Sequence, residues 1–266
     1  MKIIYHDKPF RFTKENYPLK DTFHVIDNYL EKNLWHWWDI QLVNSNIWSK
    51  TNQVSSDNQS GLPEHSFWGG TFFRGDRHLT PEDIGRGGVE KEDGLPRHIF
   101  YMPEFFDSKI RNDFGFEWVN FQYMGLNCQT QGLDGTCHYD SMEENEWNVS
   151  FLFYFNRFWN PNWGGDLRVY DKSVPGGVGK QMDKHEIGRV EFKPNRLLLF
   201  DGRIPHGAEA PKPNARYVDR RSLVLRGDEI RLVPKNEKKK ELTPRNLRFK
   251  YFTNDGDPKK TDGWYL

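Results

Sequence analysis

The feature that most constrains the fold is a series of short apolar segments in the second half of the chain. The segments are FEWVNFQYM, NVSFLFYFN, DLRVY, GRVEFK, RLLLFD and RRSLVLR. They are rich in aromatic and β-branched residues, and Gly, Pro, Asn and Asp turns separate them. Several short strands at this rhythm favour an all-β sandwich or barrel over alternating βαβ units.

The first half of the chain has a different pattern. Apolar residues at mixed spacings of three and four predict an amphipathic helix near the centre of residues 21–48. A second helix is predicted around 102–114, where Pro103 can occupy the first turn. The Gly-, Ser- and Asn-rich stretches at 49–70 and 75–94 are predicted loops.

After Pro234 the chain becomes rich in lysine. A run of like charges predicts solvated or disordered surface, within which LRFKYF can form one edge strand. We therefore predict a single domain in three parts. Residues 1–115 form an N-terminal helical and loop support, 116–230 the β core, and 231–266 a charged C-terminal extension.

Charge and hydropathy restrict the classes of partner. The 38 basic and 38 acidic residues cancel, so no overall attraction to nucleic acid or to a membrane surface results. No stretch approaches the roughly 18 consecutive apolar residues that span a bilayer, and the charged N-terminus does not resemble a secretory signal. Cys128 and Cys137 make no disulfide framework. We expect a soluble, cytoplasmic protein with neither a membrane nor a nucleic acid as partner.

His138-Tyr139-Asp140 is the first candidate for chemistry. Residues spaced i, i+2 on a strand share a face, so His138 and Asp140 can offer a nitrogen and a carboxylate oxygen to one point. His206 follows the apolar segment 197–200 through an Asp-Gly turn, which places it near a barrel rim. Two histidines and one carboxylate leave open positions on a metal, as in non-haem Fe(II) oxygenases. Each motif alone is equally typical of ordinary loop or core residues.

The segment RRSLVLR supplies a second candidate. In an alternating strand Arg220 and Ser222 share a face. A guanidinium that points into a barrel is costly unless it meets an anion, and it binds carboxylates bidentately. We predict that Arg220, with Ser222, holds a carboxylate; Arg221 and Arg216 are the alternatives.

These residues carry a resemblance to a known family. His138, Asp140, His206 and the Arg220-x-Ser222 pair, in this order, resemble the 2-oxoglutarate- and Fe(II)-dependent oxygenases. The motifs WGGDL and F-D-G-x-x-x-H resemble its prolyl-4-hydroxylase-like branch, and the match covers roughly residues 116–226. The resemblance implies a mainly β protein: a double-stranded β-helix, or jelly-roll and cupin-like barrel, with flanking N-terminal helices.

The resemblance also implies roles for these residues. His138, Asp140 and His206 would hold Fe(II), and Arg220 and Ser222 would hold the distal carboxylate of 2-oxoglutarate. The enzyme would use O₂ to decarboxylate 2-oxoglutarate to succinate and CO₂ and to hydroxylate a C–H bond, with ascorbate as a reductant. The expected substrate is prolyl, peptidyl or amino-acid-like.

Two departures put the prolyl substrate in doubt. Collagen-type prolyl hydroxylases use lysine where this chain has Arg220. Gln129-Thr130-Gln131-Gly132 replaces a tyrosine-then-glycine element, so Gln129 or Gln131 can take over a hydrogen bond to 2-oxoglutarate. One alternative is a nucleobase or nucleic-acid oxygenase, which Arg226 and the lysine-rich tail suggest. A non-catalytic cupin-like binding module is the other.

Overall fold

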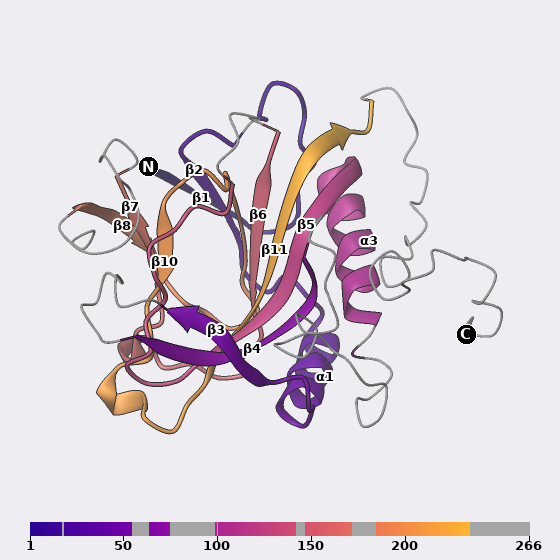
Figure 1. Ribbon diagram of the computed structural model, residues 1–266. Coiled ribbons are helices and arrows are strands. Elements are labelled where there is room, and N and C mark those ends of the chain that lie inside the picture. Colours follow the sequence, from indigo (N-terminus) through magenta and orange to yellow (C-terminus); the bar gives the residue numbers. More distant parts are fainter. Residues whose placement is uncertain are drawn as a thin grey trace, which may run out of the picture.

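Two β-sheets face each other in the computed structural model, which describes residues 1–17, 19–54, 64–74, 99, 101–141, 147–171 and 185–234 (Figure 1). Within these ranges the large sheet has eight strands in the order β1-β2-β9-β6-β11-β5-β4-β3, and the small sheet has three in the order β10-β7-β8. The strands of the large sheet are β1 (Lys2–His6), β2 (Thr22–Ile26), β3 (Ser49–Val54), β4 (His65–Arg74), β5 (Phe116–Gln129), β6 (Val149–Tyr154), β9 (Leu197–Phe200) and β11 (Arg220–Leu232). Those of the small sheet are β7 (Leu167–Tyr170), β8 (Glu186–Val190) and β10 (His206–Ala208). This arrangement confirms the predicted double-stranded β-helix.

The large sheet is buried on both faces, which explains its most apolar strands. Every residue of β6 is buried. Leu152 and Tyr154 belong to the hydrophobic cluster between the two sheets, whereas Phe151 and Phe153 belong to the cluster on the opposite face. Because both faces need apolar side chains, the segment VSFLFY lacks the alternation of a half-exposed strand.

Two helices cover the outer face of the large sheet, on the side away from β7, β8 and β10 (Figure 1). They are α1 (Lys32–Val43) and α3 (Met102–Phe114). Pro103 occupies the first turn of α3, as predicted. Trp38 of α1 and Phe106 of α3 are buried in the outer cluster. Both predicted helices are therefore confirmed.

The N-terminal part contributes more to the sheet than the sequence indicated. Residues 49–70 were predicted as a loop, but β3 and β4 form an antiparallel hairpin that pairs with β5. The prediction was wrong because SKTNQV in β3 is polar at every position before Val54 and has no apolar alternation. The described part of residues 1–115 therefore supplies strands β1 to β4 as well as helices α1 and α3. Residues 75–94, LRFKYF and the charged extension after Pro234 lie outside the described residues; the domain boundaries stay a prediction.

No helix in the described ranges is both long enough and apolar enough to cross a membrane.

The pairing of β5 with β11 sets up the floor of the site. These strands are antiparallel, and Arg220 lies opposite Gln129, which begins a row of inward-facing pairs. The pairs are Arg220 with Gln129, Ser222 with Asn127, Val224 with Gly125, and Arg226 with Tyr123. Because side chains alternate along a strand, all these residues face the small sheet. The predicted common face of Arg220 and Ser222 is thus present.

Candidate metal centre and its cavity

A cavity of about 460 Å³ lies between the two sheets. The inward-facing row of β5 and β11 lines one side, and β10 with the segment 135–140 lines the other. His138, Asp140, His206, Arg220, Ser222 and Gln129 all contact this space. The structure therefore brings together the residues that the sequence motifs selected, from segments far apart in the chain.

A backbone pairing aligns the two histidines. His138 N donates to His206 O at 2.9 Å, and His206 N donates to His138 O at 3.0 Å. Such a doubly bonded antiparallel pair points its two side chains to the same face. The imidazole rings accordingly lie with their centroids 4.6 Å apart. Asp140 N then donates to Gly202 O at 2.8 Å, which extends the pairing to the carboxylate.

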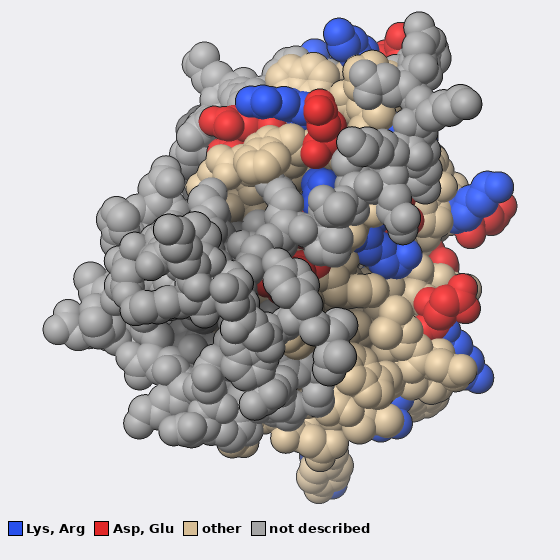
Figure 2. Space-filling view, turned by 90° about the vertical axis from the view of Figure 1, so that its right-hand side faces the viewer, with Lys and Arg blue, Asp and Glu red and all other residues tan. Residues whose placement is uncertain are grey.

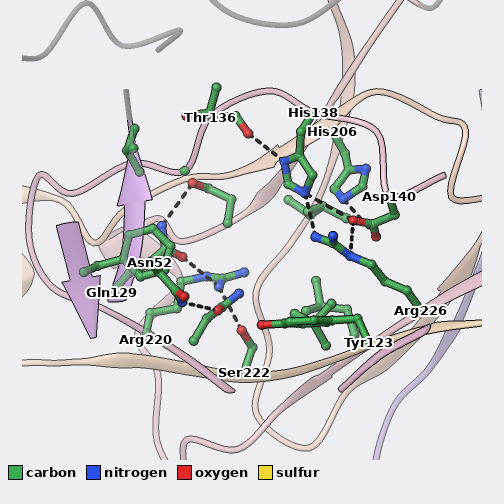
Figure 3. Close-up of a pocket in the computed structure, with 18 of the residues that line it drawn as sticks. Asn52, Tyr123, Gln129, Thr136, His138, Asp140, His206, Arg220, Ser222 and Arg226 are labelled. Atoms are coloured by element: carbon green, nitrogen blue, oxygen red, sulfur yellow. Dashed lines mark hydrogen bonds and ion pairs between the residues drawn. The ribbon is translucent and has the colours of Figure 1, made fainter. Parts of the chain in front are cut away.

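Backbone carbonyls hold the tautomer of both histidines. Nδ1 of His138 lies 2.8 Å from Thr136 O (Figure 3), and Nδ1 of His206 lies 2.8 Å from Ile204 O. A carbonyl oxygen only accepts, so each Nδ1 carries a proton, and in the neutral ring each Nε2 then presents a lone pair. Both Nε2 atoms lie near the Asp140 carboxylate, at 3.2 Å for His138 and 3.5 Å for His206.

The Asp140 side chain is buried and ionised. Burial by itself raises the pKa of this carboxyl, but the charges of Arg226 and His206 outweigh the burial and hold the pKa well below its usual range. Ser150 Oγ donates to Asp140 Oδ2 at 2.6 Å. Burial lowers the pKa of His206 to about 4, so its imidazole is neutral at pH 7.

This donor set fits a divalent metal ion. One ligand atom from each of His138, Asp140 and His206 lies within 4.8 Å of the others. Two neutral imidazoles and an ionised carboxylate on one side of an ion are the ligands of non-haem Fe(II) centres, and they leave positions open on the other side. The geometry is that predicted from His-x-Asp and the later histidine.

Arg220 is the most deeply buried charged group of the cavity, with an exposed fraction of 0%. Its Nε donates to Gly165 O at 2.7 Å, and its Nη1 donates to Gln129 Oε1 at 3.0 Å. Ser222 Oγ lies 3.4 Å from the same Nη1. Nη2 makes no hydrogen bond within the described residues, and the ring of Tyr154 lies beside the guanidinium, 5.0 Å from its centre. The guanidinium therefore keeps one N–H edge for an anion in the cavity.

The structure distinguishes the predicted anchors from their alternatives. Arg221 points away from the cavity and binds Asp39 at 2.8 Å, whereas Arg216 lies over the ring of Tyr217. Gln131 is exposed and does not line the cavity.

Gln129 lines the cavity, but its amide donates to the carbonyl oxygens of Leu133 and Ala208. Its amide oxygen accepts from Arg220, so the described contacts give Gln129 the role of orienting that guanidinium rather than of binding a ligand directly.

Gly165, in the motif WGGDL, has a specific function beside Arg220. Its φ of +86° lies in the left-handed region that favours glycine. A Cβ at this position would lie 3.3 Å from Arg220 Cδ and 3.0 Å from Trp159 Cζ2. The glycine therefore lets the backbone carbonyl approach the guanidinium that it accepts from.

Four polar residues of the site were not identified from the sequence. Tyr123 and Asn127 lie on the inward face of β5, Ser150 holds Asp140, and Asn52 Nδ2 donates to Asn127 Oδ1 at 2.6 Å. The first two follow from the period-two pattern of FEWVNFQYMGLNCQ once Gln129 is taken to face inward. Asn52 has no such signal because β3 itself was not predicted.

Arg168 of β7 lies outside the cavity lining. Its Nη2 donates to Glu209 Oε1 at 3.3 Å, and Arg189 donates to the same oxygen at 3.0 Å. These contacts join the three strands of the small sheet, so Arg168 supports the cavity wall from behind.

Comparisons with known proteins agree with this geometry. Residues 124–225 match the model of the 2OG-Fe(II) oxygenase superfamily, a range that contains all three candidate metal ligands together with Arg220 and Ser222. No curated protein sequence matches the chain.

Solved structures similar to this chain include three oxidoreductases. One is a prolyl hydroxylase from Trichoplax adhaerens in complex with a hypoxia inducible factor peptide fragment, at 20% identity and a TM-score of 0.47, covering 78% of this chain and 83% of that one. A prolyl-4-hydroxylase from Pseudomonas putida has 17% identity and a TM-score of 0.45, covering 78% and 92%. A 2OG-Fe(II) oxygenase family protein from Burkholderia pseudomallei has 10% identity and a TM-score of 0.49, covering 79% and 87%.

The family match thus falls on the same residues as the cavity geometry. Residues 124–225 therefore match the 2OG-Fe(II) oxygenase superfamily, as the motifs predicted, and the donor set of His138, Asp140 and His206 fits the iron of such enzymes.

Proposed function

We propose that this enzyme hydroxylates a C–H bond of a prolyl, peptidyl or amino-acid-like substrate. His138, Asp140 and His206 hold Fe(II), and Arg220 with Ser222 holds the distal carboxylate of 2-oxoglutarate. The observation that carries this assignment is the Nη2 edge of Arg220, which is fully buried and unpartnered among the described residues, in the same cavity as the three metal ligands.

The cost of burying a charge explains why this edge indicates a ligand. A buried guanidinium with an unused N–H loses hydration without replacement. A carboxylate supplies both the missing acceptor and the opposite charge. Ser222 adds a hydroxyl on the same face, and the apolar side chains of Leu167, Phe200 and Val224 line the same cavity.

The protein's part in the reaction is to bind, orient and shield. Fe(II) with 2-oxoglutarate, when bound, supplies the oxidative chemistry, in which O₂ converts 2-oxoglutarate to succinate and CO₂ and one oxygen atom is inserted into the substrate C–H bond. The neutral imidazoles offer their Nε2 lone pairs, and the ionised Asp140 balances part of the metal charge. Ser150 fixes the orientation of that carboxylate.

The charges of the described residues give the nucleic-acid alternative little support. Arg226, whose spacing from Arg220 suggested it, lies in the site against Asp140 and adds nothing to an outward basic surface. On the face in Figure 2, basic and acidic side chains of the described residues are interspersed rather than gathered by sign. A nucleic-acid partner instead requires a concentrated basic surface.

The test is spectroscopic. Wild-type protein mixed with Fe(II) and 2-oxoglutarate without oxygen should develop a weak visible charge-transfer band, and His138→Ala should not. Addition of O₂ should then yield succinate, with ascorbate sustaining turnover. A wild type with no band, or one that never forms succinate with a broad substrate panel, would support a cupin-like binding module instead.

A further inference from the structure

Arg226 contacts two of the three candidate metal ligands (Figure 3). Its Nε lies 2.6 Å from Asp140 Oδ1, and its Nη2 donates to Nε2 of His138 at 3.3 Å. The guanidinium lies over the ring of Tyr123, 5.0 Å from the centroid. Its side chain is 32% exposed, so Arg226 reaches from the solvent side of the cavity to the metal ligands.

The hydrogen bond to His138 and a bound metal exclude each other. Because Nδ1 of His138 donates to Thr136 O, Nε2 has a single lone pair. That lone pair can accept from Arg226 or bind a metal ion, but not both. Once it binds the metal, Nη2 of Arg226 must donate elsewhere. Nε can stay beside Asp140, because a carboxylate oxygen has further lone pairs.

The charges around the cavity indicate what accepts from Nη2. Among the described residues that line the cavity, Asp140 is the only acid, and Arg220 and Arg226 are the only permanent cations. A divalent metal, Asp140, Arg220 and the doubly negative 2-oxoglutarate together carry no net charge. Arg226, whose side chain is 32% exposed, then leaves one positive charge without a counter-ion at the cavity, and this charge attracts an anionic group.

We propose that Arg226 binds a carboxylate of the primary substrate beside the metal. The substrate class is then an amino-acid-like or other small molecule with a free carboxylate, rather than an internal residue of a peptide. The released Nη2 donates to the substrate carboxylate, which also offsets the remaining charge. This inference rests on the proposed function and narrows it.

Matched pairs of ligands test the carboxylate directly. N-acetylproline and other N-acetyl amino acids are compared with their carboxamides, using the wild-type complex with Fe(II) and 2-oxoglutarate without oxygen, by calorimetric titration. One charge-assisted hydrogen bond predicts carboxylates that bind about tenfold to a hundredfold more tightly. Arg226→Gln should bring the ratio near one. Arg231→Gln, the same change at an exposed position of the same strand, should leave the ratio unchanged.

The visible charge-transfer band distinguishes failure of the carboxylate assignment from failure of the proposed metal site. A wild type that forms the band but binds acids and amides alike, or binds neither, overturns the carboxylate assignment. So does an Arg226→Gln variant that forms the band and keeps the preference, or an alkyl phosphate that binds more tightly than the carboxylates. Absence of the band in the wild type overturns the proposed metal site instead.

Discussion

The two arginines at the ends of the inward row of β11 are held in different ways. Arg220 is fully buried, and a backbone carbonyl and an amide oxygen of the protein fix its guanidinium. Arg226 is partly exposed, and it contacts two of the candidate metal ligands, Asp140 and His138. Arg220 can therefore keep its hydrogen bonds to the protein when a ligand binds. Arg226 must exchange one of its hydrogen-bond partners when a metal binds. A fixed cation suits an invariant co-substrate, and an adaptable one suits the variable substrate.

The largest expected effect comes from Arg220→Gln. Loss of a buried, hydrogen-bonded charge partner costs a ligand about 2–5 kcal/mol, so the Kd for 2-oxoglutarate should rise by roughly a hundredfold or more. Titration of 2-oxoglutarate into the Fe(II)-loaded protein without oxygen, followed by the visible band, measures this constant. Fe(II) affinity should change little, because Arg220 contacts none of the metal ligands in the described structure.

Arg221→Gln is the matched control, one position along the same strand. Its side chain binds the buried Asp39 outside the cavity, so this variant should lower the free energy of unfolding and spare 2-oxoglutarate affinity. Equal losses of 2-oxoglutarate affinity in the two variants would contradict the assignment of Arg220 as the anchor.

At the Arg226 end of the cavity, Ser150→Ala tests how the Asp140 carboxylate is oriented. Ser150 and Arg226 each contact one oxygen of this carboxylate. Removing the hydroxyl should weaken metal binding about tenfold to a hundredfold, the usual range for residues that orient a metal ligand. Competition with a coloured chelator measures the change. An unaltered metal affinity would mean that Arg226 alone positions Asp140.

Gly165→Ala should weaken 2-oxoglutarate binding at Arg220 and leave the Arg226 end of the cavity unchanged. The new Cβ meets Arg220 and Trp159 in a left-handed backbone conformation, which should cost roughly 1–3 kcal/mol of stability. It should also raise the Kd for 2-oxoglutarate up to about tenfold, because the guanidinium is displaced. Gly132→Ala is the control: its φ is +76°, but a Cβ there meets nothing within 4 Å. That variant should lose stability and keep its 2-oxoglutarate affinity.

The same contrast explains what the sequence could predict. The candidate ligands and Arg220 were selected from the sequence because period-two alternation places His138 with Asp140 and Arg220 with Ser222, and because their order along the chain resembles the oxygenase family. Ser150 and Asn52 were not, because their roles depend on which strand lies beside which. Arg226 was noticed but attributed to nucleic acid, since its distance from Asp140 appears only when β11 and the segment after His138 are placed together.

The fold shows a similar division. Strands that are apolar on both faces, such as β6, were evident, whereas the polar β3 is held by its neighbour β4 and was mistaken for a loop. Tertiary pairing, rather than the local pattern, determines such strands.

The smallest expected effect is a change of stability with pH. It comes from a histidine that lies outside the cavity. His24 of β2 is buried, and burial, followed by the charges of His6 and Lys2, lowers its pKa from 6.5 to about 4. The unfolded chain therefore binds the proton more readily. Its contribution to stability is complete above the unfolded pKa and is lost as the pH falls towards 4.

Between pH 7.5 and 6 the free energy of unfolding should fall by roughly 1 kcal/mol through this group, measured by urea denaturation, and His24→Gln should reduce that slope. Burial also lowers the pKa of Arg220, but a guanidinium stays charged at these pH values. The contrast between the two arginines should therefore persist over the same range: the carboxylate preference of the wild type should stay constant while its stability declines. A preference that declined in parallel with stability would instead indicate that the Arg226 end depends on a titrating histidine rather than on its guanidinium.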